Sequence, residues 1–293
     1  MNECVRQRDF DPSKVKETLN RWIAGETERT AVAVTQSLEA LKFNEAASAV
    51  YEFVWGVFCD WYLELIKPAL MGDESPAKSE TRATTAWVLD QILKLLHPFM
   101  PFITEELWVH MVEHGEKRQS LLALSQWPTL TGLQSDAADA EIGWLISLVS
   151  EIRSVRSEMN VPAGAKVPLV LLEGSKALRE RLLTHGDTLK RLARVDANTY
   201  AKTAPKGSAM VVAGETTAAL PLAGIIDMEA EKKRLAREIE KAESDIAKMD
   251  AKLSNPSFME RAKPEAIEEA QARKAELAGM VKRLAAALKR LES

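Results

Sequence analysis

The sequence predicts a mainly α protein made of a helical bundle, a small α/β module and a C-terminal antiparallel coiled-coil hairpin. Three observations lead to this fold class. Apolar residues recur every three or four positions through residues 1–130, as in helices that bury one face. Short apolar runs typical of strands occur between residues 166 and 222, and a heptad pattern fills the last quarter. We therefore expect domains at residues 1–130, 138–224 and 225–293.

Composition restricts the class of protein further. The 293 residues carry a net charge of -4, so any site for a polyanion must be a local basic patch rather than the whole surface. Cys4 and Cys59 are far apart, which opposes a disulfide framework and predicts a reducing, cytoplasmic compartment. No apolar run approaches the roughly 18 residues of a membrane span, so we expect no membrane partner.

The first helices of the bundle are indicated by their terminal residues. Asp11 and Pro12 suit the N-cap and first position of a helical stretch that continues to Leu41. Asn44 suits the N-cap of a second helix, which we expect to end at Lys67-Pro68.

The rest of the bundle follows after a polar loop. The pattern predicts a helix over 85–96 that ends at His97-Pro98, and a further helix that begins at Pro101. Residues 129–138 are polar and are expected to form a linker. Aromatic side chains bury large areas, so four of them are predicted to pack in the bundle core or at the joint made by Pro98 and Pro101, rather than to stack on bases: Trp61, Tyr62, Phe102 and Trp108.

The α/β module is expected to contain a helix, a strand, a second helix and a hairpin of two strands. The periodicity predicts helices over 141–159 and 178–192, with a strand over 166–172 between them. Two further strands, 210–213 and 217–222, flank Gly214, which favours the turn of a hairpin.

The last quarter carries the seam of a coiled coil on two arms. Prolines at 256 and 264 interrupt the helix, so the chain must turn back and form an antiparallel hairpin. The predicted seam alternates spacings of four and three, with a lysine on each arm: Met228, Lys232, Leu235, Ile239, Ala242, Ile246, Met249 and Leu253, then Ile267, Ala270, Lys274, Leu277, Val281, Leu284, Leu288 and Leu291.

Two groups of charged residues fit either a solvated surface or a binding contact. The hairpin mixes many lysines and arginines with acidic residues, which fits either a solvated, salt-bridged surface or a contact with nucleic acid or protein. Arg153 and Arg156 lie near the end of one helix, where cations interact favourably with the helix dipole. A phosphate contact is the alternative for these two arginines.

No motif in the chain predicts catalysis or metal binding. His110 to His114 fits the H-x-x-E-H pattern of a zinc site, but the sequence offers no third ligand in a related setting, so we expect no metal. Phosphate-binding glycine loops and nucleophile elbows are absent, so no catalytic residue is predicted.

Several motifs resemble one family, the C-terminal tRNA-binding part of bacterial valyl-tRNA synthetases. The anticodon-binding helical domain shared by valyl, leucyl and isoleucyl enzymes is similar at 43–47 (FNEAA), 58–64 (FCDWYLE) and 97–108 (HPFMPFITEELW). The segments 152–161 (IRSVRSEMNV) and 222–227 (LAGIID), followed by the hairpin, resemble the valyl enzyme in particular.

The resemblance implies a role in a class I aminoacyl-tRNA synthetase, a ligase of protein biosynthesis. The chain would recognise tRNA(Val) through the anticodon region and outer corner, for ATP-dependent attachment of L-valine. The HIGH and KMSKS signatures are absent, so ATP and L-valine would bind outside this chain, which is expected to need no cofactor and to be inactive alone. The family also implies a monomer and a truncated first helix at Met1 to Cys4.

The family further implies that the hairpin contacts the outer corner of tRNA. Six cations near the turn are the matching candidates: Lys248, Lys252, Arg261, Lys263, Arg273 and Lys274. Antiparallel pairing is expected to bring Lys248 and Lys252 level with Arg273 and Lys274. The alternative function is a non-catalytic coiled-coil interaction protein that uses the bundle to bind a partner.

Overall fold

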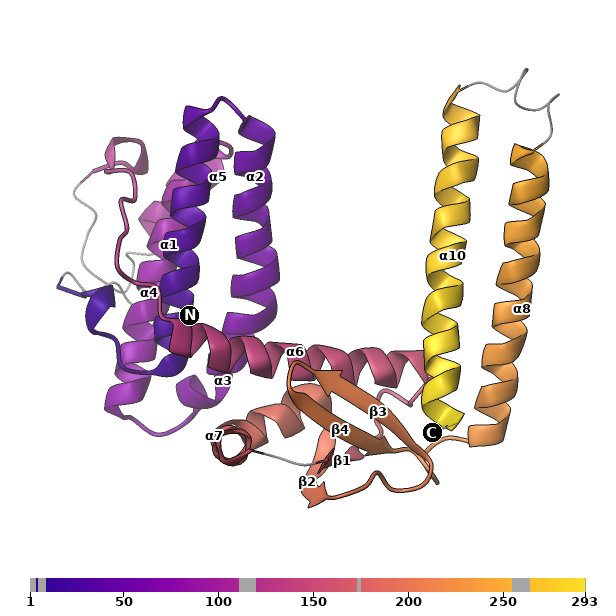
Figure 1. The fold of residues 1–293 in the computed structure, drawn as a ribbon. Coiled ribbons are helices and arrows are strands. Elements are labelled where there is room, and N and C mark those ends of the chain that lie inside the picture. The colour runs from indigo at the N-terminus through magenta and orange to yellow at the C-terminus, as the bar shows by residue number, and fades with distance from the viewer. Residues whose placement is uncertain (1–3, 5–8, 111–119, 173–174, 255–263, 293) are drawn as a thin grey trace. The chain divides into compact units, whose positions relative to one another are not determined.

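The computed structural model describes residues 4, 9–110, 120–172, 175–254 and 264–292. These residues form two compact units, Met1–Gly143 and Trp144–Ser293. The first unit is helical, and the second contains a small sheet and a helical hairpin (Figure 1). The predicted fold class, mainly α with a small α/β module, is therefore confirmed. No helix of the described ranges combines the length and hydropathy needed to cross a membrane.

The first unit is a bundle whose second helical segment is continuous through three parts and two types of helical turn. The segment starts as α2, widens into the π-helix η2 and ends as α3. The elements of this unit are η1 (Pro12–Lys14), α1 (Thr18–Glu39), α2 (Phe43–Tyr51), η2 (Glu52–Tyr62), α3 (Leu63–Met71), α4 (Pro76–Leu96), α5 (Pro101–His110) and η3 (Leu122–Leu124).

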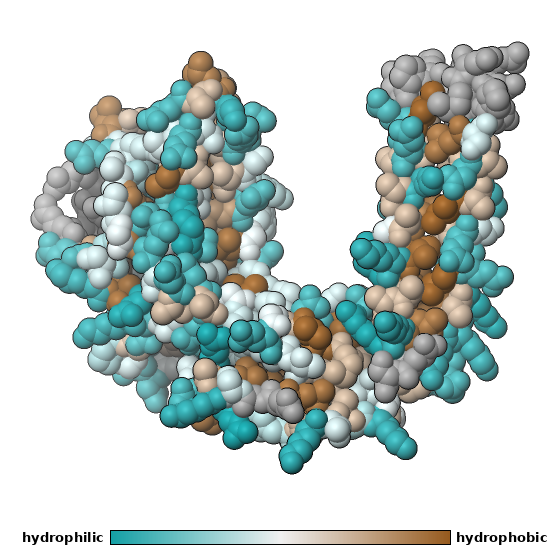
Figure 2. All heavy atoms as spheres, viewed as in Figure 1, coloured by the Kyte–Doolittle hydropathy of each residue, from teal (hydrophilic) through white to brown (hydrophobic). Residues whose placement is uncertain are grey.

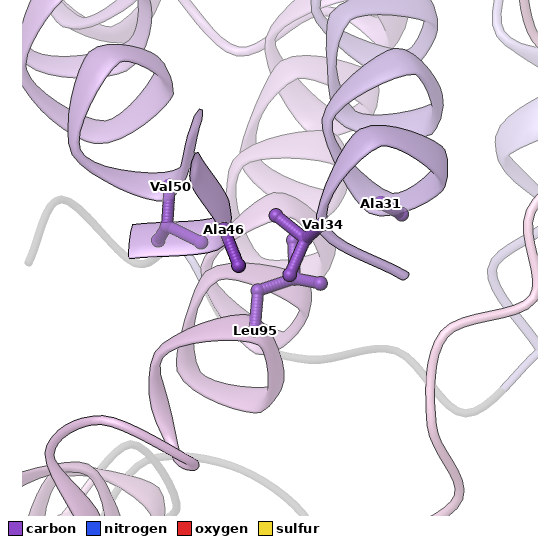
Figure 3. Packing of buried hydrophobic residues seen from close by; sticks show 5 residues of the cluster. All are labelled: Ala31, Val34, Ala46, Val50 and Leu95. Carbon is purple, nitrogen blue, oxygen red and sulfur yellow. The ribbon is translucent and has the colours of Figure 1, made fainter. Parts of the chain in front are cut away.

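One part of the bundle core joins α1, α2 and α4. Val34 of α1, Val50 of α2 and Leu95 of α4 are almost fully buried, and Figure 3 shows these side chains pointing toward one another. Ala31 and Ala46 complete the cluster, and their small side chains let the helices approach closely. Burial of this apolar surface stabilises the bundle through the hydrophobic effect.

The predicted ends of the second helix are wrong at both termini. The N-cap is Lys42 rather than Asn44, and the helix continues past Lys67-Pro68 to Met71. Pro68 lies within the last turn of α3 and lacks the N–H that would donate to the carbonyl of residue 64, yet the helix continues past it. The amide of Gly72 donates to the Pro68 carbonyl at 3.0 Å and completes that turn.

The next helix begins nine residues earlier than its apolar pattern predicts. Ser75 caps α4, because its hydroxyl accepts a hydrogen bond from the Lys78 amide at 3.1 Å, and Pro76 occupies the first helical position. The signal for this start was present in the sequence as a serine followed by a proline, inside the segment interpreted as a loop.

The predicted aromatic core is only partly confirmed. Tyr62 and Trp108 are buried and Trp61 is half-buried, but Phe102 is 91% exposed. The buried positions of α5 are Thr104 and Trp108, one turn apart. Phe102 precedes Thr104 by two residues, a rotation of about 200°, so it lies on the opposite side of the helix.

A buried polar network supports the bundle where three helical elements meet. The hydroxyl of Tyr62 donates to Asn20 Oδ1 at 3.1 Å, and the Asn20 amide donates to Glu80 Oε1 at 2.9 Å. Burial raises the pKa of Tyr62, so the phenol stays protonated and remains a donor.

The segment interpreted as a linker is held against α1. Glu28 of α1 is buried and accepts hydrogen bonds from the Leu133 amide at 2.5 Å and the Gln134 side chain at 3.1 Å. Arg29 forms an ion pair with Asp139 at 2.9 Å. Residues 133–139 are therefore part of the first unit rather than a free connection.

The sheet of the second unit has the strand order β2-β1-β4-β3. The β1 and β2 strands are parallel, and the other neighbouring pairs are antiparallel. Sequence analysis missed β2, which is an edge strand. The elements of this part are α6 (Asp136–Glu158), β1 (Val167–Leu172), α7 (Lys176–Ala193), β2 (Val195–Ala201), β3 (Ser208–Ala213) and β4 (Thr216–Pro221).

The predicted antiparallel hairpin is formed by α8 (Met228–Leu253) and α10 (Pro264–Glu292). Leu235 and Ala242 of α8 are buried, as are Ala270 and Leu277 of α10. Figure 2 shows apolar residues along the line between the two helices and hydrophilic residues on the outer sides. The turn residues 255–263 lie outside the described residues.

Removing volume from the bundle core should lower stability. Leu95→Ala should cost about 2–5 kcal/mol of unfolding free energy, because it leaves a cavity at a fully buried position. Leu41→Ala removes the same atoms from a side chain that is 74% exposed, and is the matched control. Urea denaturation of both variants tests this, and equal midpoints for the two would contradict the assigned core.

Candidate nucleic-acid interface

The two helices of the hairpin pair in the predicted register. Lys274 of α10 forms an ion pair with Asp250 of α8. Asp250 lies between Lys248 and Lys252 in the sequence, so the pairing of this region with Arg273 and Lys274 is confirmed. Lys274 occupies a seam position, where its methylene stem is half-buried and its ammonium reaches the edge of the seam.

Three cations from both arms surround the carboxylate of Asp245. Lys248 Nζ lies 2.7 Å from Asp245 Oδ1, and this hydrogen bond lowers the pKa of Asp245. The nearby charges of Lys241 and Arg273 lower the pKa further. Arg273 also pairs with Glu276 at 2.6 Å. The cations are exposed and Asp245 is half-buried, so each pair contributes little to stability, and each cation can exchange its carboxylate for another anion.

A basic stripe runs along the outer side of α8. Spacings of four, four, seven and four residues place its members within an arc of about 100°, on the side away from the seam. Each of the five side chains is exposed. This α8 basic stripe consists of Lys233, Arg237, Lys241, Lys248 and Lys252.

Sequence analysis selected only Lys248 and Lys252 from this stripe. The other members could have been found from their four-residue spacing opposite the heptad seam. Arg261 and Lys263, which were also selected, lie outside the described residues, so their place in a single patch stays a prediction.

Arg156 is buried and connects α6 to two loops through hydrogen bonds to backbone carbonyls. Its guanidinium donates to the carbonyls of Ala165 at 2.8 Å, and of Arg194 and Pro162 at 3.4 Å each. Burial, and then the charge of Arg194, lower the pKa of Arg156. The sequence placed Arg156 on a solvated face or at a phosphate. The solvated face is wrong, and the phosphate contact stays a prediction that competes with these carbonyls.

Arg153 is exposed and lies on the same end of α6. Its Nε donates to the carbonyl of Leu192 at 3.0 Å, near the C-terminal end of α7. Arg194 follows that end and donates to the Ala163 carbonyl at 2.7 Å. Arg153 is therefore the more accessible of the two arginines that the sequence selected for phosphate binding.

The base of the hairpin is fastened to the same turn of α6. Arg290 of α10 forms an ion pair with the Glu158 carboxylate. Arg234 of α8 donates to the Glu158 carbonyl at 3.1 Å and pairs with Glu231. The C-terminal end of a helix carries partial negative charge and attracts cations. Arg234 near the start of α8 and Arg290 near the end of α10 are therefore both held at the C-terminal end of α6.

The bundle presents aromatic side chains to solvent along its second helical segment. The exposed fractions are 58% for Phe43, 64% for Tyr51 and 56% for Trp55. Ala46 and Val50 of the same segment pack in the bundle core. Sequence analysis assigned aromatics to the core and missed this surface, because helical spacing alone does not tell which side of a wide apolar stripe faces solvent.

The zinc-like histidine motif is described only at its first residue. His110 Nε2 lies 3.0 Å from Glu106 Oε1, an ordinary contact between neighbouring turns. Met111 to His114 lie outside the described residues. Among the residues that are described, no cluster of histidine, cysteine and acidic side chains is arranged to hold a metal.

Comparison with known families finds two matches. Residues 20–171 match the anticodon-binding domain of tRNA ligases. Residues 227–292 match the tRNA binding arm of valyl tRNA synthetases. The first match covers the bundle and β1, and the second covers the hairpin.

Similar proteins are bacterial valine–tRNA ligases. The ligase of Caulobacter vibrioides is 54% identical over 294 residues, with 100% of this chain and 32% of the ligase covered. The ligase of Bartonella henselae is 50% identical over 291 residues, with 99% and 32% covered. The chain thus spans about a third of the length of the relatives it matches.

The structural role of Arg156 can be tested by measuring how its substitution changes the free energy of unfolding. Arg156→Met removes the charged donor from three carbonyls and should lower the free energy of unfolding by roughly 1.5–3 kcal/mol. Arg153→Met is the matched control and should cost less, because Arg153 is exposed. Thermal melts followed by circular dichroism distinguish them, and a smaller loss for Arg156 than for Arg153 would refute this role.

Proposed function

The chain belongs to the family of the anticodon-binding domain of tRNA ligases, and we propose that it binds tRNA(Val) as the C-terminal region of a valine–tRNA ligase. The observation that carries this proposal is the order of two matched regions along one chain, a bundle followed by a tRNA binding arm. Both relatives described above are valine–tRNA ligases matched over essentially the whole chain. A protein-binding coiled coil is not favoured, because both matched families are parts of tRNA ligases.

The arm supplies charge for the phosphates of the tRNA outer corner. The α8 basic stripe presents ammonium and guanidinium groups along most of α8, and Arg273 of α10 adds a guanidinium close to Asp245. Phosphates that bind there release condensed counterions, which gives affinity without base readout. The carboxylates beside these cations lie in exposed ion pairs, which are easily broken.

The bundle supplies surfaces for the anticodon region. Unpaired bases of RNA are commonly bound by stacking on aromatic side chains. Tyr51 and Trp55 expose more than half of their area on the segment formed by α2 and η2. Phe43 adds a third exposed ring at the start of that segment. These rings are the proposed contacts for anticodon bases.

The chemical step belongs to the part of the ligase that this chain does not span. The relatives are about three times as long, and the sequence contains no phosphate-binding glycine loop. ATP and L-valine would therefore bind there, and this chain would position tRNA for ATP-dependent attachment of valine. A monomeric, cytoplasmic protein completes the proposal, in line with the two separated cysteines.

Charge reversal on the arm tests the proposal. Lys252→Glu combined with Arg273→Glu should weaken tRNA(Val) binding and reduce the slope of log affinity against log salt by about one unit per lost phosphate contact. Fluorescence anisotropy at several potassium chloride concentrations measures both quantities. Circular dichroism should show that the hairpin stays helical.

The control makes the same change of net charge in the first unit. Lys14 and Lys16 are exposed near η1, away from the aromatic surface of α2 and η2, so Lys14→Glu with Lys16→Glu should leave the salt slope close to that of the parent. If the arm variant and this control have the same tRNA affinity and the same salt slope, the arm does not bind phosphates.

Removing an exposed ring tests the stacking surface of the bundle. Trp55→Ala should weaken tRNA binding by about 1–3 kcal/mol without changing the salt slope, because no charge is lost. The melting temperature should change little, since Trp55 is 56% exposed. Met71→Ala, at a side chain 81% exposed in the same unit, is the control. Unchanged affinity in Trp55→Ala would exclude that ring as a base contact.

A further inference from the structure

The segment between the two matched regions has no assigned role. Residues 172–226 follow the anticodon-binding match and precede the arm match. Lysines and arginines outnumber acidic residues there, although the whole chain has a net charge of -4. The segment contains α7 and the strands β2, β3 and β4, so its charge lies on a folded surface rather than in a tail.

Two arginines of α7 stack on aromatic rings of neighbouring elements. The guanidinium of Arg179 lies 5.4 Å from the ring centroid of Tyr200 in β2. The guanidinium of Arg181 lies 5.7 Å from the ring of Trp144 in α6. Trp144 is itself fixed by a 2.8 Å hydrogen bond from its indole nitrogen to Thr216 Oγ1. Stacking orients each guanidinium and leaves its N–H groups available at the edges.

These arginines differ from those of the arm in their partners. Arg234 and Arg273 of the arm each pair with a glutamate. Within the part of the chain that the structure describes, neither Arg179 nor Arg181 has a carboxylate partner. No carboxylate of the described residues therefore neutralises their charge.

The acidic residues of α7 are paired with lysines of the same helix. Glu180 lies 3.8 Å from Lys176, and Asp187 lies 3.1 Å from Lys190. These pairs account for the negative charges on the exposed side of the helix. The charge that remains is carried mainly by the stacked arginines.

The two stacks border one exposed side of α7. Leu178, Leu182 and Leu189 face the sheet and are buried. Arg179 reaches β2 and Arg181 reaches α6, and two residues along a helix are about 200° apart, so they leave opposite flanks of α7. Between these flanks Leu183 is 86% exposed, and Tyr200 is 48% exposed at the sheet edge.

We propose that this α7 surface, formed by Arg179, Arg181, Leu183 and Tyr200, binds the ribose-phosphate backbone of tRNA. Oriented guanidinium groups match the geometry of phosphate oxygens. The exposed ring of Tyr200 and the side chain of Leu183 offer apolar contact to a ribose or a base. A purely acidic protein surface would need only the charges of the arginines, so these apolar groups favour RNA as the partner. The inference rests on the proposed function and adds a third contact region to the bundle and the arm.

Neutral substitutions test the surface in the full chain. Arg179→Gln with Arg181→Gln should weaken binding of a tRNA(Val) transcript at least about tenfold at low salt and reduce the salt slope by roughly two units. Tyr200→Leu keeps all charges, so it should weaken binding by a smaller factor at an unchanged slope. Lys14→Gln with Lys16→Gln is the matched control and should bind like the parent.

A second measurement needs no substitution. Phenylglyoxal modifies accessible arginines, and mass spectrometry identifies the modified positions. Bound tRNA should slow the modification of Arg179 and Arg181 several-fold. Equal modification with and without saturating tRNA would overturn the proposal, even if the glutamine variant fails to fold.

The remaining outcomes separate the two proposals. If the parent chain binds tRNA and the glutamine variant binds it with equal affinity and slope, the α7 surface is not an RNA contact and the proposed function stands. If the variant instead loses affinity only for polyglutamate, the surface fits an acidic protein, which also overturns the RNA contact. If the parent chain does not bind tRNA, the proposed function fails together with this inference.

Discussion

The last turn of α6 is the point on which the second unit depends. Arginines from three helices converge there: Arg156 of α6 itself, Arg234 of α8 and Arg290 of α10. Arg156 and Arg234 donate to backbone carbonyls, whereas Arg290 pairs with the Glu158 carboxylate. Carbonyls at a helix end lack helical donors, and Arg234 supplies a donor to the Glu158 carbonyl at the end of α6. The same contacts fix the loop before β1, the end of α7 and the base of the arm.

Much of the fold is encoded in local periodicity, and the departures share a physical origin. The heptad seam and the Gly214 turn were predicted because their signals need only neighbouring residues. The prolines at 68 and 76 were both interpreted as marks of a loop. Pro76 instead occupies the first helical position, where its N–H is not needed, and α3 continues past Pro68 despite the missing donor. The strand β2 escaped because an edge strand needs no continuous apolar run, and its pairing with β1 is long-range.

The candidate site was predictable to the extent that charge pattern determines it. The level of Lys274 with Asp250 followed from antiparallel pairing, since a hairpin with a known turn has one register. Burial of Arg156 did not follow, because its acceptors come from residues 162, 165 and 194 and only the folded chain brings them together. The stacking of Arg179 and Arg181 was likewise hidden, since Tyr200 and Trp144 lie on other elements.

The heptad seam also limits the lengths that the hairpin of α8 and α10 can have. Among the described residues, polar contacts fasten one end of the hairpin around Glu158, while the seam and the Lys274–Asp250 ion pair hold the two helices together along the rest of their length. Seven residues can therefore be removed from each helix without changing which side chains meet, and each such step shortens the reach by about 10 Å. A step of any other size rotates the basic side of α8 away from its target. Relatives with longer or shorter arms should accordingly differ by whole heptads.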